Sequence, residues 1–183
     1  MIDPKVNEGK IVLGPVRLSY VHVFEKYAPD GTSDAKYSAT LMIPKSEKKT
    51  VAAINKAVEN AKKAAIASRW GGKEPKKLDL PLKDGDEKED DNFAGHWVIN
   101  AKSNTRPGLI GKDKQPITDE EDIYSGVWCY ASINFYGYSV SGNNGIAAGL
   151  NNLMKFKDDA TFGGRVSAES DFSDIDADED DDL

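Results

Sequence analysis

The sequence predicts a mostly β fold with inserted helices, arranged as a small barrel and followed by a disordered acidic tail. Several segments alternate between apolar and polar residues and are separated by turn formers, which is typical of short strands in a barrel or sandwich. Residues from 167 onward contain few aromatic and many acidic residues, a composition that cannot form a core. At 183 residues the chain suits one core. We therefore expect one folded domain at 1–166 and a tail at 167–183.

The first third of the chain predicts a hairpin followed by a helix. Residues 10–24 read as a long strand that is interrupted at Gly14-Pro15, where a bulge or an edge is expected. The turn former "APDGTS" leads into a second strand at 35–44 with alternating apolar residues. The helix expected at 46–69 has one apolar face with spacings of three and four.

The remaining elements complete a small barrel or a curled sheet. Residues 73–94 are irregular and charged, which indicates a solvated loop, and 95–103 is a third strand. A long loop leads to the strand 126–140, and 146–157 is expected to form a short helix that runs into a last strand. The five-stranded OB-type barrel is the best-known small fold of this kind, and its open face binds nucleic acids or sugars.

The acidity of the chain is concentrated at its C-terminus. Nine of the 31 acidic residues fall within 169–183, which leaves 22 acids against 24 basic residues and a charge of about +2 on the rest. A slightly basic body neither requires nor forbids an anionic partner. One cysteine excludes an internal disulfide and fits a reducing cytoplasm. No apolar run approaches the roughly 20 residues of a membrane span, so we expect no membrane partner.

Signatures of catalysis are mostly missing. A zinc site would require His22, His96, Cys129 and a carboxylate to converge, yet Cys129 falls on the apolar face of its strand. The acidic runs "DGDEKEDD" and "DEED" lie in predicted loops, whereas metal sites of hydrolases usually take carboxylates from ordered strands. We expect no catalytic residue, metal or cofactor. A magnesium-dependent nuclease or recombination enzyme remains one alternative, and an acidic-tailed adaptor that mimics DNA is another.

The segment "GVWCYASINFYGYSV" (126–140) carries large side chains on both faces of one predicted strand. One face is apolar, whereas the other holds aromatic rings with polar groups, and six of the chain's 16 aromatic residues fall between Tyr124 and Tyr138. Rings on a sheet face beside basic residues are typical of proteins that hold single strands without reading sequence. The pattern leaves a second interpretation open, in which the helix at 46–69 covers the rings and they form core. The apolar face consists of Val127, Cys129, Ala131, Ile133 and Phe135.

The tail also favours a nucleic-acid-binding function. A flexible acidic segment can compete with phosphates for a basic groove, and its end can dock to partner proteins; alternatively it serves solubility alone. The residues predicted to bind partners are Asp178, Glu179, Asp180, Asp181, Asp182 and Leu183.

Five segments resemble, in this order, a family of bacteriophage single-stranded-DNA-binding proteins first described as a domain of unknown function. The resemblance spans about residues 8–166 and implies an OB fold, a function in phage replication and recombination in the host cytoplasm, and an acidic tail. Tails of this type often end in phenylalanine, and Leu183 departs from that pattern. The segments are "RLSYVHVFE", "KYSATLMIPKS", "WVINAKSNTRPG", "IYSGVWCYASINFYGY" and "GIAAGLNNLMKFKDD".

The combined prediction is a non-enzymatic protein that coats single-stranded DNA and recruits replication or recombination proteins through its tail. We expect bases to stack on aromatic side chains and phosphates to meet basic ones. The predicted stacking residues are Trp128, Tyr130, Tyr136 and Tyr138, helped by Tyr20 and Tyr37. The predicted phosphate contacts are Arg17, Lys36, Lys102 and Arg106, and Asn134 is expected to hydrogen-bond base edges.

Overall fold

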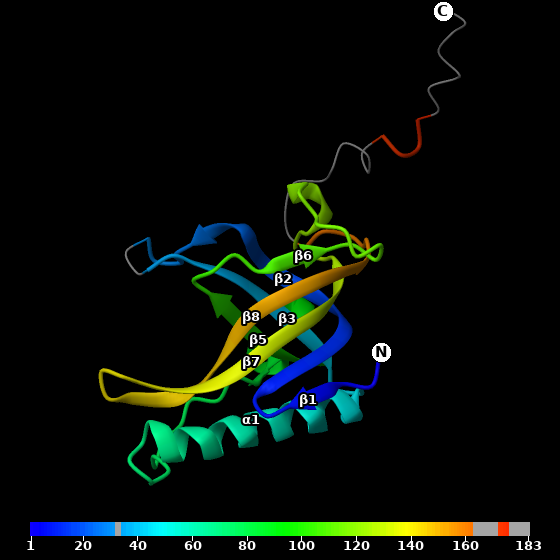
Figure 1. The fold of residues 1–183 in the computed structure, drawn as a ribbon. Helices are drawn as coiled ribbons and strands as arrows, with labels where there is room; N and C mark the ends of the chain where they lie inside the picture. The colour runs from blue at the N-terminus through cyan, green and yellow to red at the C-terminus, as the bar shows by residue number, and fades with distance from the viewer. Residues whose placement is uncertain (32–33, 163–171, 176–183) are drawn as a thin grey trace, which may run out of the picture.

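Long strands wrap into a closed barrel, and one helix lies across an end of it in the computed structural model of the chain (Figure 1). The structure describes residues 1–31, 34–162 and 172–175. The strands are β1 (Lys5–Asn7), β2 (Lys10–Tyr27), β3 (Lys36–Pro44), β4 (Lys83–Asp84), β5 (His96–Ser103), β6 (Gly108–Ile110), β7 (Trp128–Val140) and β8 (Asn143–Lys157). The helix is α1 (Lys48–Ser68), and short 3₁₀ turns are η1 (Gly85–Glu87), η2 (Asp91–Phe93) and η3 (Glu120–Asp122).

Five of the strands form the barrel in the order β5-β3-β2-β7-β8. Neighbours along this order are antiparallel, and the barrel closes where β5 and β8 pair in parallel at Ala101↔Ala148 and Lys102↔Gly149. The short strands β1, β4 and β6 add to β2, β5 and β8. This arrangement confirms the predicted OB-like five-stranded barrel. The register of β2 against β7 shifts between Leu13 and Val16, which confirms the interruption expected at Gly14-Pro15.

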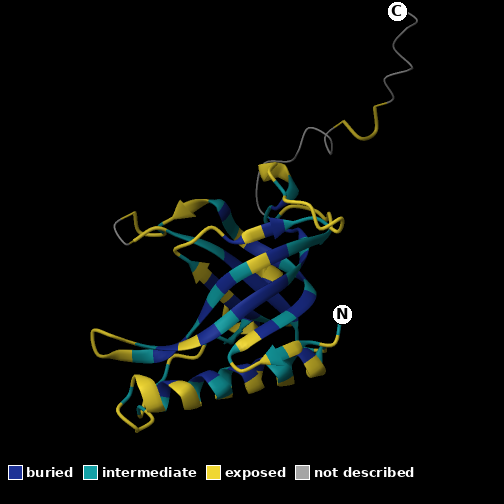
Figure 2. Cartoon of the chain, viewed as in Figure 1, coloured by how far each residue is buried: buried dark blue, intermediate teal, exposed yellow. Residues whose placement is uncertain are grey.

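Buried apolar residues of the strands form the barrel interior. Figure 2 colours the buried residues dark blue along the ribbon. The predicted apolar face of the strand at 126–140 points inward, and even Phe135, its most accessible member, is only 4% exposed. Burial raises the pKa of the Cys129 thiol to about 12, so this thiol stays protonated. Cys129 is therefore a packing residue within the described core.

Helix α1 forms where it was predicted and packs on the barrel through small side chains. Its buried residues include Ile54, Ala61 and Ala65. A Cβ on Gly137 of β7 would collide with Ala65, so the strand must carry glycine there for the helix to approach. The aromatic face of β7 is not covered by this helix to form core, because Tyr136 is 43% exposed and the other rings are only partly buried. The interpretation of these rings as core is therefore wrong.

The segment 146–157 is not helical, which corrects the prediction of a short helix. All of it belongs to β8, which pairs with β7 along the whole hairpin and with β5 and β6 on its other side. Ile146, Ala148 and Leu150 alternate into the interior. Pairing with β7 along its length and with β5 and β6 at 148–149 and 152–154 outweighs the helical tendency of the alanine-rich sequence, because the sheet supplies hydrogen-bond partners to its backbone.

The charged segment 73–94 is more structured than the predicted solvated loop. It contains β4 and two 3₁₀ turns, and Gly85 and Phe93 within it are buried. The ammonium of Lys45 lies 2.6 Å from carboxylate oxygens of both Asp84 and Asp86, which fixes this segment to the end of β3. None of the helices in the described residues is long and apolar enough to cross a membrane.

Candidate nucleic-acid interface

The structure distributes the predicted DNA-binding residues over three regions instead of one site. At about 3.3 Å per residue, Trp128 and Tyr138 at the two ends of β7 lie roughly 30 Å apart. One region is the β2–β3 hairpin with the end of β5, which holds Lys36, Tyr37, Lys102 and Arg106. A second is the outer row of β7, with Tyr130, Asn134, Tyr136 and Tyr138. The third surrounds Arg17, Tyr20 and Trp128.

Basic and aromatic side chains interleave at the β2–β3 hairpin, which extends beyond the barrel (Figure 1). The Lys26 ammonium lies 5.8 Å from the centre of the Tyr37 ring, and the Arg106 guanidinium carbon lies 5.5 Å from the centre of the Phe24 ring. Both distances suit cation–π attraction. We call this set the hairpin cluster; its members are His22, Phe24, Lys26, Tyr27, Lys36, Tyr37, Lys102 and Arg106.

The positive charges of the hairpin cluster are available to a ligand. Among the described residues, no acidic side chain forms an ion pair with Lys26, Lys36, Lys102 or Arg106. His22 stacks on Tyr27 with ring centres 4.1 Å apart, and burial lowers the pKa of His22. Its imidazole is therefore neutral at pH 7, and the lysines and arginine supply the charge.

Four members of the hairpin cluster escaped the sequence prediction. Strand β2 continues to Tyr27, beyond the predicted end at residue 24, and this extension carries Lys26 and Tyr27. Tyr27 pairs with Lys36 across the hairpin. The dipeptide Lys-Tyr occurs on both arms of the turn, at 26–27 and 36–37. This repeat is the signal that could have identified both arms. His22 and Phe24 lie on the same strand.

The outer row of β7 contains one open ring beside a groove. Tyr136 lines a groove of about 670 Å³ between α1 and β7, where Lys63 and Arg69 also lie. Tyr130 packs edge-on against Phe156, with ring centres 5.6 Å apart. The Tyr138 hydroxyl donates a hydrogen bond of 3.3 Å to Asp79. Tyr136 is thus the member of the row with the best access to a base.

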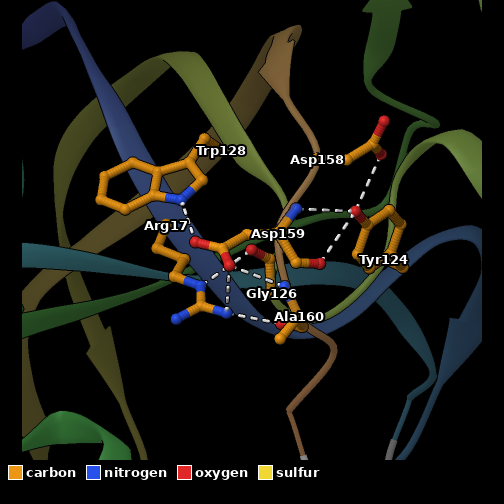
Figure 3. Close-up of polar contacts among 7 residues, drawn as sticks. All are labelled: Arg17, Tyr124, Gly126, Trp128, Asp158, Asp159 and Ala160. Carbon is orange, nitrogen blue, oxygen red and sulfur yellow. Dashed lines mark hydrogen bonds and ion pairs between the residues drawn. The ribbon is translucent and has the colours of Figure 1, made fainter. Parts of the chain in front are cut away.

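The chain that follows β8 crosses the third region. Residues 158–162, which we call the strap, contact Arg17, Tyr124 and Trp128 (Figure 3). The Trp128 indole N–H donates a hydrogen bond of 2.8 Å to Asp159, and the Tyr124 hydroxyl donates one of 2.8 Å to Asp158. The Arg17 guanidinium donates to the carbonyl oxygens of Gly126 and Ala160.

Electrostatics favours ionised carboxylates in the strap. The hydrogen bond from Trp128 holds the pKa of Asp159 below its usual range, with help from the Ala160 amide and the charge of Arg17. The pKa of Asp158 is lowered mainly by Lys155. Arg17 lies 3.6 Å from the Asp159 carboxylate. Two residues predicted to contact DNA, Arg17 and Trp128, are therefore engaged by the protein's own chain.

Tyr20, in the third region, lies at a bulge of β2. Its φ of +48° is unusual for a residue with a side chain, and the register shifts between Ser19 and His22. Its ring is 55% exposed and meets Phe93 edge-on. The Tyr20 hydroxyl donates a hydrogen bond of 2.8 Å to Asp90, which raises the pKa of the tyrosine.

The acidic runs have structural partners in the described residues. Asp84 and Asp86 bind Lys45, while Asp90 and Asp119 accept backbone N–H groups at the starts of η2 and η3. The described part of the chain contains no group of three or more histidine, cysteine or acidic residues placed to hold a metal ion. The predicted tail lies outside the described residues except for 172–175, and so do the predicted partner-binding residues 178–183.

Comparison with known proteins identifies the family. The family described as "Enterobacter phage Enc34, ssDNA-binding protein" matches residues 9–183. The single-stranded DNA-binding protein from bacteriophage Enc34, solved in complex with ssDNA, is similar with a TM-score of 0.74 and 29% identity over 85% of this chain and 90% of that chain.

Two further relatives extend this comparison. Putative protein p50 of Acyrthosiphon pisum secondary endosymbiont phage 1 is 33% identical over 95% of this chain and 98% of its own length. The bacteriophage T7 single-stranded DNA binding protein gp2.5 shares the fold, with a TM-score of 0.60 and 14% identity over 86% of this chain and 97% of that one. The chain therefore belongs to the family of the Enterobacter phage Enc34 ssDNA-binding protein.

Proposed function

We propose that this protein binds single-stranded DNA without reading its sequence and coats it during phage replication or recombination in the host cytoplasm. The observation that carries the proposal is the hairpin cluster, where cations that form no ion pair within the described part of the chain lie beside aromatic rings. The Enc34 relative solved in complex with ssDNA supports the same ligand.

In this proposal the basic residues of the hairpin cluster bind phosphates and its aromatic residues stack on bases. Lys26, Lys36 and Arg106 bind phosphates, and binding releases the counterions that surround the strand. Tyr27 is 47% exposed and offers a ring to a base. Each stacked base contributes about 1–3 kcal/mol, and because every base has a π face, the stacking tolerates any sequence.

The position of the hairpin cluster also fits the general behaviour of OB barrels. These barrels bind oligonucleotides on their second and third strands and on the loops between strands one and two and between four and five. In this barrel the corresponding elements are β3, β5, the β2–β3 hairpin and the β7–β8 hairpin. The hairpin cluster occupies the first of these loops and the end of β5.

The acidic tail is proposed to regulate binding and to recruit partners. Its nine carboxylates within 169–183 present anions to the same cations that bind phosphate. When DNA displaces the tail, residues 178–183 become available to replication or recombination proteins.

A titration tests the proposed function directly. Fluorescently labelled oligo(dT) and a matched duplex are titrated with the full chain at several salt concentrations. We expect the single strand to bind much more tightly, because duplex pairing hides the base faces, and the affinity to fall linearly with the logarithm of salt concentration. Equal affinity for both forms at moderate salt would contradict the proposal. Incubation of the labelled DNA with Mg²⁺ and the protein tests the nuclease alternative.

A further inference from the structure

The strap covers an apolar patch on the outside of the barrel. Met42 of β3 and Val98 of β5 are buried there together with Phe93, and Phe162 of the strap packs against them. Arg17 and Trp128, directly paired on β2 and β7, also contact the strap. We propose that this patch, Arg17 and Trp128 form a nucleotide subsite. The strap occupies this subsite in the free protein, and single-stranded DNA binds there by displacing the strap. The inference rests on the proposed function.

Asp159 occupies the position of a phosphate in this subsite. One carboxylate oxygen accepts the Trp128 indole N–H at 2.8 Å, and the other lies 3.6 Å from the Arg17 guanidinium. A phosphate oxygen accepts the same two donors, and arginine is well suited to phosphate because of its planar array of N–H groups. The Arg17 guanidinium can therefore bind an anion in both states: the Asp159 carboxylate when the strap is in place, and a phosphate when DNA has displaced it.

Phe162 occupies the position of a base. Its ring lies against the Arg17 guanidinium, with 4.0 Å between the guanidinium carbon and the ring centre. It also packs on the apolar patch formed by Met42, Phe93 and Val98. A nucleobase is flat, aromatic and able to stack on a guanidinium in the same way. The strap thus presents an anion and a ring next to each other, which are the two recognisable parts of a nucleotide.

The strap is held weakly enough to exchange. Its residues 158–161 are exposed, and the Asp159 side chain is 40% accessible. Exposed ion pairs contribute little to stability. Among the described residues, the backbone–backbone contact of the strap with the barrel is the hydrogen bond of 3.0 Å from the Phe162 N–H to the Ser125 carbonyl. The other hydrogen bonds of the strap to the barrel involve the side chains of Arg17, Tyr124 and Trp128 and are exposed to solvent. A strand that binds the hairpin cluster at the same time has a higher effective concentration at this subsite than a free nucleotide has.

A pair of charge-matched variants tests the competition. Asp159→Asn keeps the size of the side chain and an acceptor oxygen but removes the charge beside Arg17. Asp3→Asn removes the same charge from a side chain that is 88% exposed beside α1. We expect Asp159→Asn to bind oligo(dT) about two- to ten-fold more tightly than Asp3→Asn, since a competing contact of modest strength is removed. Equal affinities would overturn the inference.

Amide hydrogen exchange gives a readout that does not depend on affinity. In the full-length wild-type chain, saturating oligo(dT) should accelerate exchange of the Phe162 amide, because displacement breaks its hydrogen bond to Ser125. Unchanged or greater protection of this amide would overturn displacement while leaving single-strand binding intact. Absence of oligo(dT) binding by the wild-type chain would overturn the proposed function together with this inference.

Discussion

The Trp128 indole N–H and the Asp159 carboxylate form a 2.8 Å hydrogen bond that joins the start of β7 to the chain following β8. The bond has two consequences. It orients the ring on the outer surface of the barrel, and it keeps the pKa of Asp159 below its usual range. The strap is therefore held by an ionised group, and its attachment depends on pH.

Acid should loosen the strap. A group whose pKa is lowered in the folded protein stabilises the fold above its ordinary pKa, about 3.9 for aspartate, and this contribution is lost as the pH falls through the lowered value. We expect the NMR signal of the Trp128 indole proton to titrate with a midpoint below about 3.9. The same signal in Asp159→Asn should show no such step. A midpoint at or above the ordinary aspartate value would contradict the attribution to this bond.

The hairpin cluster should carry a large share of the affinity for single strands. Tyr27→Ala should weaken oligo(dT) binding by about 1–3 kcal/mol, because one stacking surface is lost. Lys26→Gln and Lys36→Gln should each reduce the slope of log affinity against log salt by about 0.7, the value expected for one phosphate contact on a single strand. Fluorescence anisotropy over a salt series measures both effects.

Lys56→Gln provides the matched control for the lysine variants. Lys56 is exposed on α1, so the substitution changes the net charge equally but touches no member of the hairpin cluster. A salt slope that changes equally in all three lysine variants would show that general charge, and not the hairpin cluster, determines binding.

Adjacent residues of β7 should separate binding from stability. Tyr136→Ala should weaken single-strand binding by about 1–3 kcal/mol and leave the melting temperature nearly unchanged, since its ring is open to solvent. Phe135→Ala removes a ring from the interior and should cost about 3–5 kcal/mol of unfolding free energy. Thermal melts and anisotropy titrations of both variants test the pair. If Tyr136→Ala binds oligo(dT) as tightly as the wild type, the Tyr136 ring does not contact the bound DNA.

Local patterns predicted the barrel strands because each strand has an inside and an outside. The alternation at 35–44 and 126–140 matches the inward residues of β3 and β7, and the stripe of α1 matches its packed face. Local pattern did not predict the conformation of the start of 146–157, because this conformation depends on pairing with strands on both sides. Its small residues, such as Gly149 against Asn134, suit the close pairing of strands as well as they suit a helix.

The sequence predicts which types of residue form the candidate site better than it predicts where they lie in the fold. The sequence leaves open which face of the strand at 126–140 is exposed; the tertiary fold places its aromatic row outside the barrel and separates Trp128 from Lys36 and Tyr37. The strap could not be inferred from sequence, because Asp159 meets Arg17 across 142 positions of chain and no local pattern records that contact. Tyr27 is absent from the predicted site because β2 extends three residues beyond the predicted end at residue 24.

Truncation of the acidic tail separates the effect of the tail on DNA binding from that of the strap. Deleting residues 169–183 removes nine carboxylates and changes the formal charge from −7 to about +2 while leaving the strap in place. If the tail competes with phosphates for the cations of the hairpin cluster, the truncated protein should bind oligo(dT) more tightly. The gain should be largest at low salt, because ions screen the tail over a Debye length of about 10 Å at 0.1 M.

The same truncation should leave the fold unchanged and abolish recruitment of replication partners, because so polar a segment has little to bury and its end is the proposed docking element. Combining the truncation with Asp159→Asn tests whether tail and strap compete with DNA independently. If they do, the fold-increases in oligo(dT) affinity from the two changes should multiply. Anisotropy titrations of the wild type, the truncated protein, Asp159→Asn and the combined variant at low and moderate salt measure these affinities. If the truncated protein binds oligo(dT) no more tightly than the full chain at low salt, the tail does not compete, and partner docking is the function left to it.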